Sequence, residues 1–348
     1  MKKIDYSYLS ELSWDSETIG LLTRIYEYNG RQKLYLKQKP VKYKQLSKMI
    51  RLKSADASIE IEGDRRSYAP SIKVLYPPSE NETEPSYSKS DKEMIKGYRD
   101  ALSIAFKDDV FNITPDVILE LHRELYKYSD KKGGSYRVSG GSAVFAYDVP
   151  KVIEEMCNSY NLLSLRQRYK QYKDVDVLIL IPVFIRDYFV LQPFDEGEIK
   201  MCCLLLDLLL YRSDFMIGKY ISLESKIARR RGEFSNELWQ NPNEWRDSIS
   251  DHTSFIKLLL RIILEAYEEF EKCVSLLDNK LTAKEIVRQA FGSGTLQRGD
   301  VLRLCPTLSR ASVENSLRQL VEDGYLNRIG DGRSTYYMRS QLSYFAGK

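Results

Sequence analysis

The stretch LQPFDEGEIKMCC, from Leu191 to Cys203, decides the fold of this chain. A loop with proline, acidic residues and glycine leads directly into a long apolar segment, residues 199–210. Such a loop at the N-terminus of a helix is suited to binding an anion, because the first backbone N–H groups lack partners and the helix dipole is positive there. The stretch therefore predicts a buried helix that begins at an anion-binding loop.

The composition is that of a soluble globular protein. Of the 348 residues, 43% are hydrophobic and 29% are charged, and this length suffices for two or three domains. The apolar runs at residues 177–185 and 201–210 are too short for a membrane span, which takes ~20 residues. The start, Met1 to Asp5, has no apolar signal region. We expect a cytoplasmic protein that has no membrane partner.

Histidine and cysteine usage argues against common catalytic sites. The chain has only 2 histidines, His122 and His252, and neither lies in the loop. Histidine is the usual general base near neutral pH, and the helix-like surroundings of His122 indicate a packed or partly exposed helix residue rather than a catalyst. The 5 cysteines form no CxxC pair, which favours free thiols in a reducing compartment and predicts no zinc site.

Periodicity and turn residues predict a mostly helical chain. We expect a helix over 90–106 capped by Ser90, and another opened by Thr114, because serine and threonine are favoured caps. The two apolar stretches at 177–191 and 199–211 are typical of helices at the centre of a domain. Other expected elements are helices at 21–28 and 43–51, an exposed loop at 76–87 and a β-hairpin at 138–148.

The last 68 residues, 281–348, carry 10 Lys and Arg against 6 Asp and Glu. Helices are predicted at 282–290, 297–303 and 309–323, the last with Val313, Leu317 and Leu320 on one face and Gly324 at its end. A turn at 330–332 joins two short strands, 325–329 and 334–338, into a hairpin. Three helices followed by a hairpin resemble a winged helix-turn-helix domain.

The loop itself resembles the signature of the Fic family, His-Pro-Phe-x-Asp/Glu-Gly-Asn-Gly-Arg-x-x-Arg. The match holds at Pro193, Phe194, Glu196 and Gly197. It fails elsewhere: Gln192 stands at the catalytic histidine, Glu198 at the asparagine, Ile199 at the second glycine, Lys200 at the first arginine and Cys203 at the last.

Other landmarks of the family follow in the right order between residues 40 and 277. They are an inhibitory-like pattern at Ser58 to Gly63, a helix motif at 98–102, a stretch at 119–137 that ends in Gly-x-Tyr-Arg, a flap position at 138–148 and the helix after the motif at 220–233. The resemblance implies a mainly α fold: a Fic (Fido) helical core with a small β-hairpin flap, followed by a winged-helix domain. We divide the chain into an N-terminal helical region, 1–88, the core, 89–278, and the winged helix, 279–348.

Most Fic proteins transfer AMP from ATP to a target hydroxyl, and the resemblance implies ATP and Mg²⁺ as ligands. Residues at matching positions are Glu196, Gly197 and Lys200 for nucleotide, with Glu196 also for Mg²⁺. The inhibitory pattern corresponds to Ser58, Glu62 and Gly63, and the flap to Val144 and Phe145. Gln192 cannot act as a general base, and losing one typically costs about 100- to 10,000-fold in rate. Since Cys203 cannot pair with Glu62, we interpret Glu62 as a structural helix residue.

Three functions remain open from the sequence. The first is a regulator or scaffold that transfers no AMP and acts through its winged helix. Its DNA-facing residues would be Arg310, Ser312, Asn315, Ser316 and Gln319 at the bases, and Arg333 at the backbone or minor groove. The second is an active nucleotidyl or phosphoryl transferase that uses Glu196 or Glu198 as its base. The third is a scaffold whose flap binds a peptide by β-augmentation. Winged helices also mediate dimerisation or protein docking, so a homodimer is an alternative to DNA contact.

Overall fold

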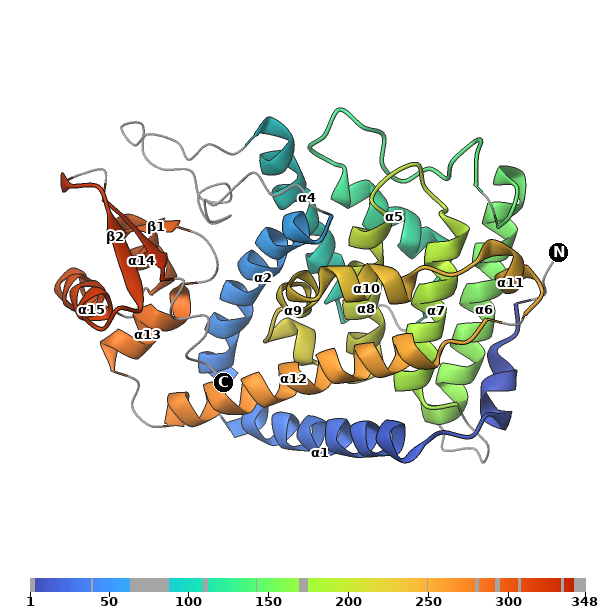
Figure 1. Cartoon of the computed structure of the whole chain (residues 1–348), viewed down its shortest axis with the longest axis horizontal. Helices are drawn as coiled ribbons and strands as arrows, with labels where there is room; N and C mark the ends of the chain where they lie inside the picture. The colour runs from blue at the N-terminus through green and yellow to red at the C-terminus, as the bar shows by residue number, and fades with distance from the viewer. Residues whose placement is uncertain are drawn as a thin grey trace.

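The computed structural model describes residues 4–38, 40–62, 88–108, 112–141, 143–168, 175–248, 250–278, 282–291, 295–305, 308–332 and 335–340. The chain is mainly helical, with one small sheet near its C-terminal end (Figure 1). Two apolar cores hold it together. The large core is built from residues 4–274 and the small core from residues 287–326.

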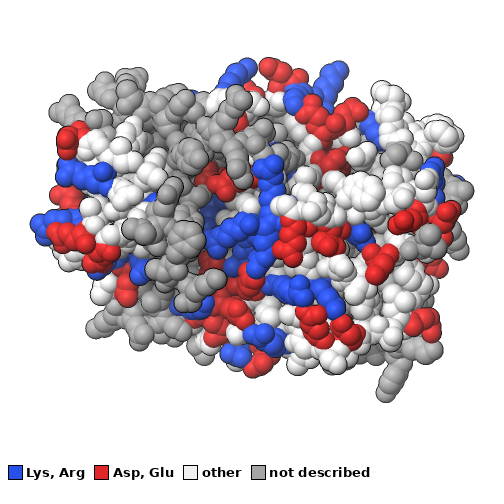
Figure 2. Space-filling model, viewed as in Figure 1, with Lys and Arg blue, Asp and Glu red and all other residues white. Residues whose placement is uncertain are grey.

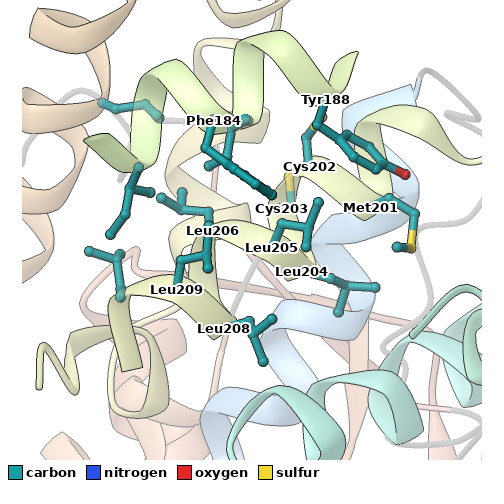
Figure 3. Close-up of a cluster of buried hydrophobic side chains, with 14 of the residues drawn as sticks. Phe184, Tyr188, Met201, Cys202, Cys203, Leu204, Leu205, Leu206, Leu208 and Leu209 are labelled. Atoms are coloured by element: carbon teal, nitrogen blue, oxygen red, sulfur yellow. The ribbon is translucent and has the colours of Figure 1, made fainter. Parts of the chain in front are cut away.

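Two consecutive helices form the centre of the large core. They are α7 (Val177–Leu191) and α8 (Glu198–Arg212), and nearly all of their side chains are buried. Figure 3 shows Phe184 of α7 pointing toward Leu205 and Leu206 of α8, with Tyr188 further along α7. Fully burying one such side chain contributes about 2 kcal/mol, so the packing of these helices also fixes the short loop that joins them. The prediction of two buried central helices is confirmed.

The remaining helices surround this pair (Figure 1). Helix α1 (Ser16–Gln38) packs along α12 (Thr253–Asp278), and α2 (Pro40–Glu62) packs against α4 (Lys89–Ala105) and α9 (Leu223–Arg229). The other elements are η1 (Tyr6–Glu11), α5 (Pro115–Leu125), η2 (Ala146–Asp148), α6 (Val149–Arg168), η3 (Ile217–Lys219), α10 (Arg231–Leu238) and α11 (Pro242–Arg246). None of the helices in the described part of the chain is long and apolar enough to cross a membrane.

The C-terminal unit contains three helices and three strands. The helices are α13 (Ala283–Ala290), α14 (Arg298–Leu304) and α15 (Arg310–Glu322), and they agree closely with the predicted ones. The strands β1 (Thr295–Gln297), β2 (Leu326–Ile329) and β3 (Tyr336–Arg339) form an antiparallel sheet in the order β1-β3-β2. Strand β2 pairs with β3 as predicted, whereas β1, which pairs Leu296 with Tyr337, was not expected from the sequence.

Two local predictions are wrong. Helix α4 is capped by Ser88 rather than Ser90, because the Ser88 hydroxyl accepts the Asp91 N–H and the Asp91 carboxylate accepts the Ser88 N–H in return. The flap segment is not a β-hairpin: its described residues form turns and the 3-10 helix η2. Left-handed Gly140 and Gly141 turn the chain there, and the carbonyls of Gly140 and Val144 bind an arginine side chain instead of a second strand. The predicted loop at 76–87 lies outside the described residues.

Candidate functional site

The loop between α7 and α8 is bounded by two residues with left-handed backbone. Gln192 ends α7 with φ 45° and ψ 63°, and Gly197 precedes α8 with φ 81°. A non-glycine residue in this region costs about 1–2 kcal/mol, so the backbone of Gln192 is strained. Gln192 is exposed, and it stands at the position that the resemblance gives to the family's histidine. Gly197 must also be small, because an added Cβ would lie 2.7 Å from the Tyr126 hydroxyl oxygen.

Arg137 ties the start of the flap to this loop. Its buried guanidinium donates to the carbonyls of Leu191 and Gln192, at 3.3 and 2.7 Å, where α7 leaves its last carbonyls unpaired. It also donates to the carbonyls of Ser139, Gly140 and Val144. A cation at a helix C-terminus gains further stabilisation from the helix dipole. Arg137 therefore fixes the loop and the flap relative to each other.

His122 supports the loop from the side of α5. Its ring stacks on Phe194 with 3.7 Å between centroids and 2° between planes. The Gly134 N–H donates to Nδ1 at 2.9 Å, which leaves the proton on Nε2, and Nε2 lies 3.2 Å from the Glu196 carbonyl oxygen that accepts it. Burial lowers the pKa of His122 to about 4. His122 is thus a neutral, packed positioning residue, as predicted from its sequence context.

An acidic side chain of the protein itself occupies the anion-binding end of the loop. Glu198, the first residue of α8, accepts a hydrogen bond from the Phe194 N–H through Oε1 at 2.9 Å. Burial raises the pKa of Tyr188, and the nearby negative charge of Glu198 raises it further. Burial lowers the pKa of Arg137, and the charge of Glu198 opposes this shift. A phosphate approaching this amide would therefore meet a carboxylate that already accepts its hydrogen bond.

The residues predicted to bind nucleotide or metal differ in their surroundings. The exposed carboxylate of Glu196 forms an ion pair with Lys131. Lys200 is buried within α8, with 2% of its surface exposed. Among the described residues, no group of three or more His, Cys, Asp or Glu side chains is placed to hold a metal ion.

The inhibitory-like pattern lies at the end of α2. Ser58 is buried and donates its hydroxyl to the Ala55 carbonyl at 2.8 Å, which is a contact within the helix. The side chain of Glu62 and all of Gly63 lie outside the described residues. Cys203, at the position of the family's last arginine, is buried at 2% exposure.

The flap presents aromatic side chains to solvent. Val144 is buried, whereas Phe145 and Tyr147 are 68% and 77% exposed. Their rings stack on each other, with centroids 5.5 Å apart and planes inclined by 8°. The sequence identified Phe145 but not its stacking partner.

The candidate DNA-contacting residues on α15 differ in their exposure. Arg310 is exposed and pairs with Glu314 at 3.2 Å, Ser312 is half-buried, and Asn315 is exposed and accepts a hydrogen bond from Arg318 at 2.7 Å. Ser316 was expected to be exposed, and this is wrong, because its hydroxyl is buried against the Ser312 carbonyl. Gln319 is half-buried, and Arg333 lies outside the described residues.

A buried acidic pair between α8 and α9 was not expected from the sequence. Asp207 of α8 and Glu224 of α9 are 1% and 0% exposed. Glu224 accepts hydrogen bonds from Tyr98 at 2.9 Å and from Ser222 at 3.0 Å. Burial, followed by the charge of Glu224, raises the pKa of Asp207 well above its ordinary value. One isolated aspartate in an apolar helix gives no signal of such a partner.

No protein-family model matches the sequence, and no curated protein matches it either. Solved structures do match the fold. A Fic family protein from Desulfovibrio desulfuricans superposes with a TM-score of 0.60 at 18% identity, over 95% of this chain and 98% of that one. A Fic domain containing signaling protein from Bacteroides thetaiotaomicron gives 0.52 at 18% identity, over 75% and 97%. Fic-1 from C. elegans gives 0.54 at 16% identity, over 74% and 73%. The chain therefore has the Fic fold.

Proposed function

We propose that this protein is a Fic-fold regulator that does not transfer AMP and that acts through its C-terminal unit. The observation that carries the first part is the hydrogen bond from the Phe194 N–H to the Glu198 carboxylate, at 2.9 Å. It places a negative charge where a phosphate would need a backbone donor. Gln192 adds to this, because an amide side chain cannot take a proton from a target hydroxyl near neutral pH.

The test is AMP transfer from ATP labelled at its α-phosphate, together with calorimetric titration of ATP and Mg²⁺. The wild type should label no protein. The double variant Glu198→Asn/Ile199→Gly should bind ATP more tightly than the wild type, and adding Gln192→His should restore measurable transfer. Labelling by the wild type, or ATP binding that this double variant weakens, would refute the proposal.

No specific contact favours the alternative of an active transferase with a different base. Glu196 is engaged by Lys131, and Glu198 accepts the Phe194 N–H. Binding of Mg²⁺ at Glu196 would have to displace Lys131. Glu196→Gln should therefore leave any nucleotide titration unchanged if we are right.

We further propose that the C-terminal unit, residues 279–348, is a winged helix that contacts DNA with α15. The succession of α13, α14 and α15 with the β2–β3 hairpin supports this, as do the exposed side chains of Arg310 and Asn315. The exposed face of α15 is not strongly basic, because Arg310 pairs with Glu314 and Arg318 with Glu322. Sequence-specific contacts must therefore supply more of the affinity than phosphate attraction.

Selection from a pool of random DNA duplexes tests this proposal. A preferred sequence should emerge, and Asn315→Ala should relax the preference at one position by about 1–3 kcal/mol. Arg246→Ala, an exposed change on α11, is the matched control. If no sequence is enriched, the proposal of DNA contact is refuted, and dimerisation or protein docking remains for this unit. Light scattering of the full chain would detect a homodimer.

A second function, binding of a protein segment at the flap, is favoured by the exposed pair Phe145 and Tyr147. Without a flap strand, such a partner would be held by apolar side-chain contacts and not by β-augmentation. Phe145→Ser should abolish capture of a partner peptide from a displayed library, and Tyr8→Ser, an exposed tyrosine of η1, should not. Equal capture of the peptide by both variants would exclude the flap as the binding surface.

A further inference from the structure

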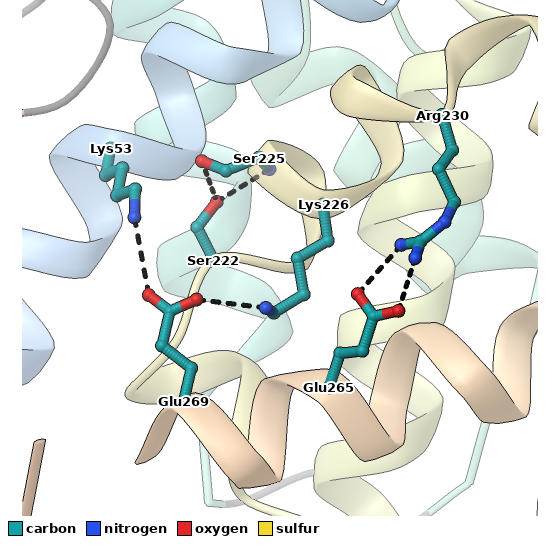
Figure 4. Close-up of polar contacts among 7 residues, drawn as sticks. All are labelled: Lys53, Ser222, Ser225, Lys226, Arg230, Glu265 and Glu269. Atoms are coloured by element: carbon teal, nitrogen blue, oxygen red, sulfur yellow. Dashed lines mark hydrogen bonds and ion pairs between the residues drawn. The ribbon is translucent and has the colours of Figure 1, made fainter. Parts of the chain in front are cut away.

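A group of cations lies away from the loop, where three helices meet. We define the cationic cluster as Lys53 of α2 with Lys226 and Arg229 of α9. Figure 4 shows the two lysines pointing at the same carboxylate, Glu269 of α12, from different sides. Lys226 Nζ lies 2.9 Å from one oxygen of Glu269, and Lys53 Nζ lies 3.7 Å from the other.

The cluster holds more positive charge than its carboxylate can neutralise. Arg229 is exposed and forms no ion pair of its own within the described ranges. The neighbouring Arg230 is already neutralised by two contacts to Glu265. The three cations near Glu269 and its single negative charge leave a net charge of +2. The C-terminal end of α9 carries a partial negative charge, which reduces this excess by about half a charge.

Partial burial makes this charge excess costly. The Lys226 side chain is only 7% exposed, and those of Lys53 and Glu269 are 34% and 35% exposed. Burial lowers the pKa of Lys53, and the repulsion from Arg229 and Lys226 adds to this effect although Glu269 opposes it. Like charges held this close in a partly buried place repel one another more strongly than they would in water. An added anion would relieve that repulsion.

We propose that the cationic cluster is a binding site for a phosphate dianion, as in free phosphate or the terminal group of a phosphomonoester. A dianion matches the charge excess, whereas a carboxylate or a phosphodiester brings only one negative charge. Two ammonium groups supply undirected attraction, and the guanidinium of Arg229 offers two parallel donors to phosphate oxygens. Lys and Arg side chains gather over this part of the surface, in the middle of the face seen in Figure 2.

The site is separate from the loop and does not depend on the function proposed above. Its residues come from α2, α9 and α12, and none of them belongs to the stretch 191–203. Leu52, next to Lys53 in α2, packs against the small core of the C-terminal unit. An anion held by Lys53 would therefore bind one residue away from the contact between the two cores.

The experiment is calorimetric titration of the full chain with inorganic phosphate, phenyl phosphate and dimethyl phosphate. Phosphate and phenyl phosphate should bind, and dimethyl phosphate, a monoanion, should bind about tenfold more weakly or not at all. Arg229→Ser should weaken phosphate binding about tenfold, since one charge-assisted contact is lost. Glu269→Gln should tighten it, because the competing carboxylate is removed.

Matched variants locate the site. Arg246→Ser makes the same charge change on α11 and should leave phosphate binding unchanged. Lys131→Ser removes the cation that pairs with Glu196 at the loop and should also leave phosphate binding unchanged, which separates this site from the loop. The proposal is overturned if no phosphate binds, if Arg229→Ser has no effect, or if only the loop variant alters binding. Equal affinity for dimethyl phosphate would refute the dianion as the ligand.

Discussion

His122 should make the stability of the large core depend on pH in a defined window. Its pKa is lowered from an ordinary 6.5 to about 4 in the folded protein, chiefly by burial. Between these values the unfolded chain binds a proton that the folded chain refuses, so stability is complete above pH 6.5 and falls as the pH drops toward 4. The difference corresponds to about 3 kcal/mol.

The variant His122→Phe isolates this contribution. Phenylalanine keeps the stacking on Phe194 but cannot titrate, and it leaves the Gly134 N–H and the Glu196 carbonyl without their ring partner. At pH 7.5 we expect the variant to be less stable by about 2 kcal/mol. Near pH 4 the gap should close or reverse, because only the wild type has lost the His122 contribution.

Denaturant unfolding followed by tryptophan fluorescence measures this. All 3 tryptophans, Trp14, Trp239 and Trp245, precede residue 279, so their fluorescence reports the unfolding of the large core. Carboxylates also titrate in this range of pH, but they are common to both proteins. The difference between wild type and variant is therefore the readout. Parallel stability curves from pH 7.5 to 4 would refute the assignment of His122 as buried and neutral.

The same fluorescence assay checks three further changes. Gly218→Ala should destabilise the protein by about 2 kcal/mol, because the added methyl overlaps the Asp207 carboxylate. Gly20→Ala, which has open space in α1, should stabilise it by about 0.5–1 kcal/mol. Effects of the same sign would contradict this pair of predictions. Gln192→Gly should stabilise by about 1 kcal/mol by removing left-handed strain, and a loss of stability would show that the Gln192 side chain has a structural role. Arg137→Met should cost about 3 kcal/mol because five backbone carbonyls lose their donor; a loss under 1 kcal/mol would mean that water replaces it.

Much of the helical architecture was predictable because its signals are local. Thr114 as a cap, the apolar runs of α7 and α8, and the helix-and-hairpin succession of the C-terminal unit are all readable within a few residues. The flap was predicted wrongly for the opposite reason. Its Gly-Gly turn is compatible with a hairpin, and only Arg137, which binds the flap carbonyls, withholds them from strand pairing.

The candidate site was predictable in its position and not in its contacts. Order along the chain places Gln192, Glu196 and Lys200 at the loop. It does not place Glu198 against the Phe194 N–H, Lys131 against Glu196, or Lys200 in the interior. Those outcomes depend on side-chain directions set by the packing of α5, α7 and α8.

The sequence by itself determined which residues occupy the loop, and hence that no histidine stands at its first position. It also determined the buried helices on either side, since an all-apolar helix must lie inside a core. Only the tertiary structure decided that His122 is a support for the loop, that Asp207 meets Glu224, and that lysines from α2 and α9 meet at Glu269. The physical reason is that charge and hydrogen-bond partners act over a few ångströms in space, whereas these residues lie 17 to more than 200 positions apart in the chain.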